Sequence, residues 1–124
     1  MTVMYMGGTN DGSGWRSELI PMLNIDTKMS LVNEYENFDY ILYTITPVLT
    51  RFHILEKILK LSKEHSNRFI LCILDQDICI DTGCTVKFSD DMINLLRYFE
   101  KIILNNNAEV FWSLEMVANY VNDI

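Results

Sequence analysis

The chain has 124 residues, of which 49% are hydrophobic, and its 10 lysines and arginines stand against 17 aspartates and glutamates, a net charge of −7. This length suits one domain spanning residues 1–124, and the ordinary balance of apolar and charged residues argues against intrinsic disorder. An acidic chain lacks the Lys and Arg surplus that displaces counterions from a phosphate backbone, so we expect no nucleic-acid polymer as partner and favour a small molecule or a protein.

The sequence shows no targeting or membrane segment. Residues 1–8 lack a basic beginning, and their apolar run is too short for a signal peptide. The longest apolar runs fall far below the roughly 20 residues that cross a bilayer. We therefore expect a cytoplasmic protein that makes no membrane contact.

The three cysteines do not form a recognisable metal site. Cys72 lies in the most apolar stretch, where a buried thiol behaves as a small hydrophobic group. Cys79 and Cys84 have only His53 and His65 to complete the roughly four ligands that zinc takes. We expect no metal and no cofactor.

Short apolar runs predict strands at 2–6, weakly at 29–32, and at 40–46, 69–74 and 109–112. Near-continuous apolar runs are typical of strands that are buried on both faces of a parallel sheet.

Helical periodicity separates these strands. It predicts helices over 15–23, with Ser13 as cap, over about 50–65, from Ser89 to Asn105, and from Ser113 to the C-terminus. Alternating strands and helices imply right-handed βαβ units. We predict an α/β fold with a doubly wound, flavodoxin-like parallel sheet of five strands in the order 2-1-3-4-5.

In such sheets the ligand occupies the crevice beyond the carboxyl ends of the strands, where the strand order reverses. This rule selects the loops after the first, third and fourth strands. The first loop, 7–16, has four glycines that permit close backbone approach, and it leads into a helix N-terminus. It is neither a GxGxxG nor a Walker A loop. It is equally compatible with a plain βα connection, with Trp15 a packing ring and Arg16 a surface charge.

The helix after the third strand carries Glu56 within an apolar face. This carboxylate is either solvated beside the buried stripe or a nucleophile or base whose apolar surroundings tune its pKa. Arg51, His53 and Arg68 are assigned by default to solvent or to helix ends. The segment 75–88 after the fourth strand is interpreted as a surface loop or short hairpin that overhangs the pocket, since its aspartates do not match an EF-hand.

Several segments together resemble one family. The run Tyr5-Met-Gly-Gly-Thr followed by Ser13-Gly-Trp-Arg is similar to the opening of nucleoside 2-deoxyribosyltransferase-like proteins. The resemblance continues at 39–47, 52–56, 69–74 and 107–120, and covers nearly the whole chain.

This resemblance implies a flavodoxin-like domain that transfers or hydrolyses the N-glycosidic bond of a nucleoside or nucleotide. Glu56 would be the nucleophile, and Tyr5 would hold its carboxylate by a hydrogen bond. It also implies a homodimer or larger homo-oligomer. The substrate-binding residues expected here are Gly7, Gly8, Thr9, Trp15, Arg16, Thr46 and His53.

The chain also departs from the family pattern. The stretch 48–55 has no Asp, Glu, Ser or Gly, so protonation of the leaving base is unassigned, with His53 as the substitute acid, and bulky Phe52 and His53 obstruct a phosphate route. The segment 29–39 looks shortened by a helix. We rank an enzyme first. The alternative is a catalytically inactive relative that binds a nucleotide-like ligand or another protein.

Overall fold

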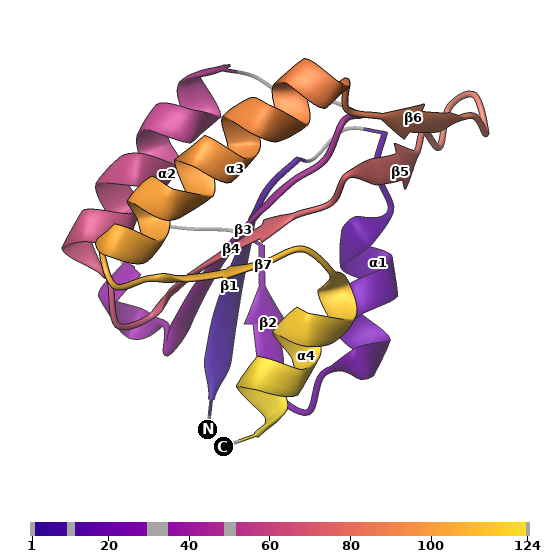
Figure 1. The fold of residues 1–124 in the computed structure, drawn as a ribbon. Helices are drawn as coiled ribbons and strands as arrows, with labels where there is room; N and C mark the ends of the chain where they lie inside the picture. The colour runs from indigo at the N-terminus through magenta and orange to yellow at the C-terminus, as the bar shows by residue number, and fades with distance from the viewer. Residues whose placement is uncertain (1, 10–11, 30–34, 49–51, 124) are drawn as a thin grey trace.

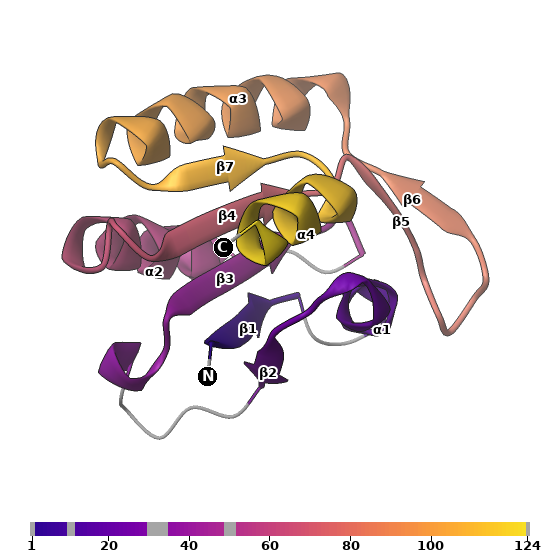
Figure 2. The same ribbon diagram turned by 90° about the horizontal axis from the view of Figure 1, so that it is seen from below.

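The computed structural model describes residues 2–9, 12–29, 35–48 and 52–123. Its main feature is a five-stranded parallel sheet in the order β2-β1-β3-β4-β7, which confirms the predicted α/β fold and flavodoxin-like strand order (Figure 1). The strands are β1 (Val3–Gly8), β2 (Asp26–Lys28), β3 (Tyr40–Ile45), β4 (Phe69–Ile73) and β7 (Glu109–Phe111). The view from below shows them side by side in this order (Figure 2).

Two helices cover each face of the sheet. The helices α2 (Phe52–Glu64) and α3 (Asp90–Asn105) cover one face, whereas α1 (Trp15–Leu19) and α4 (Leu114–Asn122) cover the other (Figure 1). The strands β1, β3 and β4 are buried on both sides, as their apolar runs predict, and alternation along β1 sends Met4 and Met6 toward α1 and α4 but Tyr5 toward α2. The core is therefore two apolar layers divided by the sheet.

The predicted caps of the last two helices are confirmed. The Ser89 hydroxyl accepts a hydrogen bond from the Met92 amide, and the Ser113 hydroxyl accepts one from the Met116 amide, each at 3.1 Å. The predicted cap of the first helix is wrong by one residue, because Gly14 holds the N-cap position. The hydroxyl of Ser13, one residue earlier, accepts a hydrogen bond from the Trp15 amide at 3.3 Å and donates to the Asp77 carboxylate at 2.5 Å.

The second strand lies earlier than the weak apolar run at 29–32 predicts. It is β2, Asp26–Lys28, while Met29 lies beyond it and residues 30–32 are outside the described part. Among the described residues this edge strand pairs with β1 alone, and it leaves Asp26 and Lys28 exposed, so its formation needs no apolar run.

Two further boundaries differ from their predictions. The helix predicted over 15–23 is α1 followed by a 3₁₀ helix, η1 (Ile20–Met22), because Pro21 lacks the amide that would continue an α-helix. In the shortened segment, the described part of the chain contains the 3₁₀ turn η2 (Tyr35–Asn37). The half-buried guanidinium of Arg68 donates to the Phe38 carbonyl at 2.6 Å and joins this turn to the sheet.

Candidate functional site

The carboxyl ends of β1 and β3 bring together several of the residues predicted to bind substrate. The Thr9 amide donates to the Thr44 carbonyl at 2.9 Å, and the Thr46 amide donates to the Thr9 hydroxyl at 3.1 Å. Gly8 permits this approach with a φ of 109°, because a Cβ there would lie 2.1 Å from the Thr44 carbonyl oxygen. At the strand-order reversal, the backbones of β1 and β3 therefore approach each other closely, as the glycine pair indicates.

Trp15 and Arg16 lie at the same edge, and their polar groups bind the protein's own backbone. The Trp15 indole donates to the Thr9 carbonyl at 2.6 Å, and Arg16 donates to the same oxygen at 2.8 Å and to the Met6 carbonyl at 3.1 Å. The guanidinium also stacks over the Trp15 ring, 4.4 Å from its centroid. Burial lowers the pKa of Arg16 from its ordinary value. This pair ties α1 to the end of β1.

Tyr5 and Glu56, the predicted catalytic pair, lie in different environments. The Tyr5 ring is buried in an aromatic cluster, with centroids 5.7, 5.5 and 5.9 Å from Tyr35, Phe38 and Tyr43. Glu56 is exposed and lines a surface hollow on α2 with Lys60 and Lys63. Within the described part of the chain, no hydrogen bond joins the two side chains.

The buried face of α2 explains this separation. Ile58, Leu61 and Ser62 turn toward the sheet, so Glu56 points away from it. Lys57 lies toward the aromatic cluster, with its ammonium 5.8 Å from the Tyr43 ring centroid. His53 is exposed in the first turn of α2, and Arg51 lies outside the described residues.

The segment after β4 forms the predicted short hairpin, β5 (Gln76–Ile78) with β6 (Thr85–Lys87). It bends over the glycine-rich loop, where the Ile80 amide donates to the Gly12 carbonyl at 2.8 Å. The Asp77 carboxylate accepts hydrogen bonds from the Ser13 hydroxyl and from the Ile78 amide. Asp77 therefore anchors the hairpin to the loop, a role that the sequence alone does not indicate.

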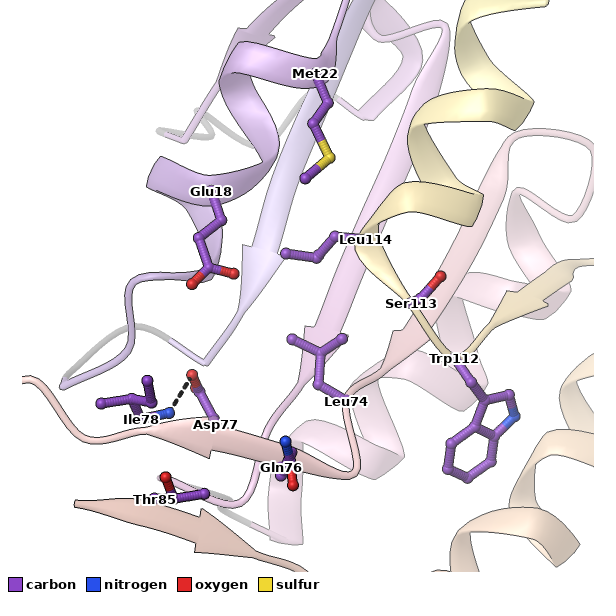
Figure 3. A pocket seen from close by; sticks show the side chains of 10 residues that line it. All are labelled: Glu18, Met22, Leu74, Gln76, Asp77, Ile78, Thr85, Trp112, Ser113 and Leu114. Carbon is purple, nitrogen blue, oxygen red and sulfur yellow. Dashed lines mark hydrogen bonds between the residues drawn. The ribbon is translucent and has the colours of Figure 1, made fainter. Parts of the chain in front are cut away.

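A pocket of about 340 Å³ opens between α1, this hairpin and the beginning of α4 (Figure 3). Met22, Leu74 and Leu114 form apolar walls, and the Glu18 carboxylate points into the space from α1 (Figure 3). Gln76, Asp77, Ile78, Thr85, Trp112 and Ser113 complete the lining.

This pocket lies beyond the ends of β4 and β7, beside the predicted reversal between β1 and β3. The crevice rule points to the segment after the fourth strand, but it does not find Glu18 or Leu114, because their approach depends on how α1 and α4 pack. The indole of Trp112 donates to the Glu100 carboxylate at 3.0 Å, so a residue that does not line the pocket orients this ring.

The Cys72 thiol is buried and unreactive. Burial raises the pKa of the Cys72 thiol to about 12, so it stays protonated, as its apolar setting predicts. Among the aromatic side chains, Tyr35, Phe38 and Phe99 pack against the core, whereas Tyr98 is 67% exposed. Self-association stays a prediction.

Within the described ranges, no cluster of three or more His, Cys, Asp or Glu side chains is arranged to hold a metal ion. None of the described helices is both long and apolar enough to span a membrane. No family model, curated protein or solved structure matches the chain.

Proposed function

We propose that this domain binds an uncharged ligand of the nucleoside class in the pocket between α1, the β5–β6 hairpin and α4, without cleaving it. The observation that carries the proposal is the pocket itself, which is lined by the apolar side chains of Met22, Leu74 and Leu114 and by the carboxylate of Glu18 at the carboxyl edge of the sheet. This is the edge at which open α/β sheets bind their ligands. The nucleoside class comes from the resemblance of the chain to deoxyribosyltransferase-like proteins.

The size and chemistry of the pocket support this choice. Its volume of about 340 Å³ lies within the range of small-molecule sites, roughly 300–1,000 Å³. Leu74 and Leu114 offer apolar surface to a base or sugar, and the Glu18 carboxylate accepts hydrogen bonds from N–H or O–H donors. Glu18 and Asp77 repel a phosphate, as does the net charge of −7. A free nucleoside therefore suits the pocket better than a nucleotide.

The expected binding can be measured by titration calorimetry with a panel of nucleosides and their 5′-monophosphates. We expect at least one nucleoside to bind and its monophosphate to bind at least about tenfold more weakly. Glu18→Gln removes a charged acceptor and should lower the affinity for the nucleoside by about 10- to 100-fold. Glu115→Gln makes the same chemical change on α4 outside the pocket lining and should leave affinity within about twofold.

A second pair of variants tests the location. Met22→Trp places an indole in the pocket and should reduce affinity at least about tenfold by excluding the ligand. Met116→Trp adds the same ring at another exposed methionine, which does not line the pocket, and should have little effect. Absence of binding by every nucleoside to folded protein, or equal affinity of the two tryptophan variants, would refute the proposal.

Glycosyl transfer through Glu56 is the second candidate, favoured by the assembly of Gly8, Thr9 and Thr46 at the strand-order reversal. In that reaction the carboxylate of Glu56 bonds to the anomeric carbon as the C–N bond breaks, and the departing base nitrogen takes a proton from water. An acceptor base or water then takes the sugar.

Because Glu56 points away from Tyr5 and from the sheet, we expect nucleosides, nucleotides and NAD to stay intact, with or without an acceptor base, when followed by chromatography. Release of free base by the wild type but not by Glu56→Ala would instead establish the enzyme. In that case the binding-only proposal would fail.

A further inference from the structure

Cys79 and Cys84 face each other across the β5–β6 hairpin. The strands pair Gln76 with Lys87 and Ile78 with Thr85, so the next position in this register pairs Cys79 with Cys84. The Cys79 amide donates to the Cys84 carbonyl at 2.9 Å, which extends the ladder to this pair. Directly opposed residues of an antiparallel pair carry their side chains on the same face.

The turn that follows holds the two cysteines in this register. The Gly83 amide donates to the Cys79 carbonyl at 2.7 Å, and Gly83 takes the left-handed conformation that closes the turn, with a φ of 71°. Both sulfur atoms lie close to Thr82. The Cys84 thiol donates to the Thr82 carbonyl at 3.8 Å, and hydrogen bonds from the Thr82 side chain and from the Thr82 and Asp81 backbone lower the pKa of Cys79.

The spacing of such a pair suits a disulfide. Cys79 and Cys84 share one of the two backbone hydrogen bonds of a hydrogen-bonded antiparallel pair, since the Cys84 amide donates to the Thr82 hydroxyl at 3.2 Å. Residues of such pairs have Cα atoms about 5.5 Å apart, within the roughly 4.4–6.8 Å that disulfides span. Their Cβ atoms are usually about 4.5–5.5 Å apart, whereas a disulfide draws them to about 3.5–4.5 Å. The bond therefore forms with a small contraction of the hairpin, and the resulting strain favours its reduction.

We propose that Cys79 and Cys84 are an oxidative modification site, at which a low-molecular-weight disulfide converts the two thiols into a reversible bridge. The Cys79 thiolate attacks one sulfur of the oxidant, which forms a mixed disulfide and releases one thiolate. The Cys84 thiolate then attacks the Cys79 sulfur and releases the second small thiol. Two electrons pass from the cysteines to the oxidant, and the two protons they lose end on the released thiols.

The rest of the molecule fits this assignment. Cys84 is exposed and Cys79 is partly exposed, so an oxidant reaches both, whereas Cys72 is completely buried and stays protonated. The bridge lies next to Ile78 and Thr85, which line the pocket, and beside Gly12 of the loop that the hairpin covers. Oxidation thus acts on the hairpin that forms one wall of the pocket, but formation of the bridge does not depend on a ligand being bound there.

The test is incubation of the folded, reduced protein in glutathione buffers of graded composition, followed by acid quenching, alkylation and mass spectrometry. We expect the wild type to lose two hydrogen atoms, with peptide mapping that joins Cys79 to Cys84 and leaves Cys72 alkylated. Excess reduced glutathione should restore both thiols. Cys84→Ser should instead stop at a mixed disulfide of Cys79 with glutathione, because the resolving thiol is absent.

Three results would overturn the proposal. They are two separately glutathionylated cysteines, a disulfide between two chains on a non-reducing gel, or thiols that persist in the most oxidising buffer. Cys84 is exposed, so Cys84→Ser is expected to fold, and circular dichroism of each sample confirms that the native protein was oxidised.

Discussion

Replacing Gly8 with alanine is expected to lower the free energy of unfolding by about 3–5 kcal/mol, measured by urea denaturation. The residue has a φ of 109°, a conformation that L side chains rarely adopt, and its new Cβ would lie 2.1 Å from the carbonyl oxygen and 2.6 Å from the amide nitrogen of Thr44. Both neighbours are backbone atoms of the central strand β3, so they cannot move aside as a flexible side chain does.

Gly83→Ala is the matched control for this substitution. Gly83 also has a positive φ, 71°, but no atom lies within 4 Å of the position of its Cβ. Gly83→Ala should therefore lower the free energy of unfolding by only about 1 kcal/mol, from backbone strain alone. Equal losses at the two glycines would show that the close approach of β1 to β3 is not what requires glycine at position 8.

Arg16→Met should lower the free energy of unfolding by about 2–4 kcal/mol. The guanidinium donates to the carbonyls of Met6 and Thr9, and methionine keeps much of the apolar length but has no donor. The carbonyls lose a charged partner at a half-buried site, and the Trp15 ring loses the cation stacked upon it. Thermal unfolding and urea denaturation both measure the loss.

Arg97→Met separates the stacking from the hydrogen bonds. Arg97 lies over the Trp112 ring at 4.6 Å, much as Arg16 lies over Trp15, but it is exposed on α3. An exposed cation–π contact contributes only about 0.5–1 kcal/mol. If Arg97→Met destabilised the protein as much as Arg16→Met, the carbonyl contacts of Arg16 would not be its main contribution.

Much of the fold could be predicted because its signals are local. The runs at 40–46 and 69–74 lie over β3 and β4, since a strand buried on both faces must be apolar throughout. Ser89 and Ser113 cap their helices because the cap bond is made within four residues. The position of strand β2 could not be predicted in this way, because an exposed edge strand depends on pairing with β1 and not on its own side chains.

Less of the site could be predicted, because its residues depend on packing. Thr9 and Thr46 come together as the crevice rule expects. The orientation of Glu56 has no local signal, since a residue between two apolar helix positions turns inward or outward according to which side of the helix the sheet covers. Ser13 and Asp77, 64 residues apart, meet only because the hairpin folds back over the first loop.

The sequence by itself determined the net negative charge, the buried strands β3 and β4, the caps at Ser89 and Ser113 and the glycine-rich loop at the carboxyl edge, because strand burial, helix caps and backbone conformation are properties of short segments. The alternation of strands and helices predicted the parallel order through the right-handed βαβ rule. The tertiary structure alone decided that Arg16 binds backbone carbonyls, that Glu56 points to solvent, and that a pocket opens beside Glu18. These outcomes depend on which faces of α1, α2 and α4 are covered. That choice is made by packing between segments that are distant in the chain.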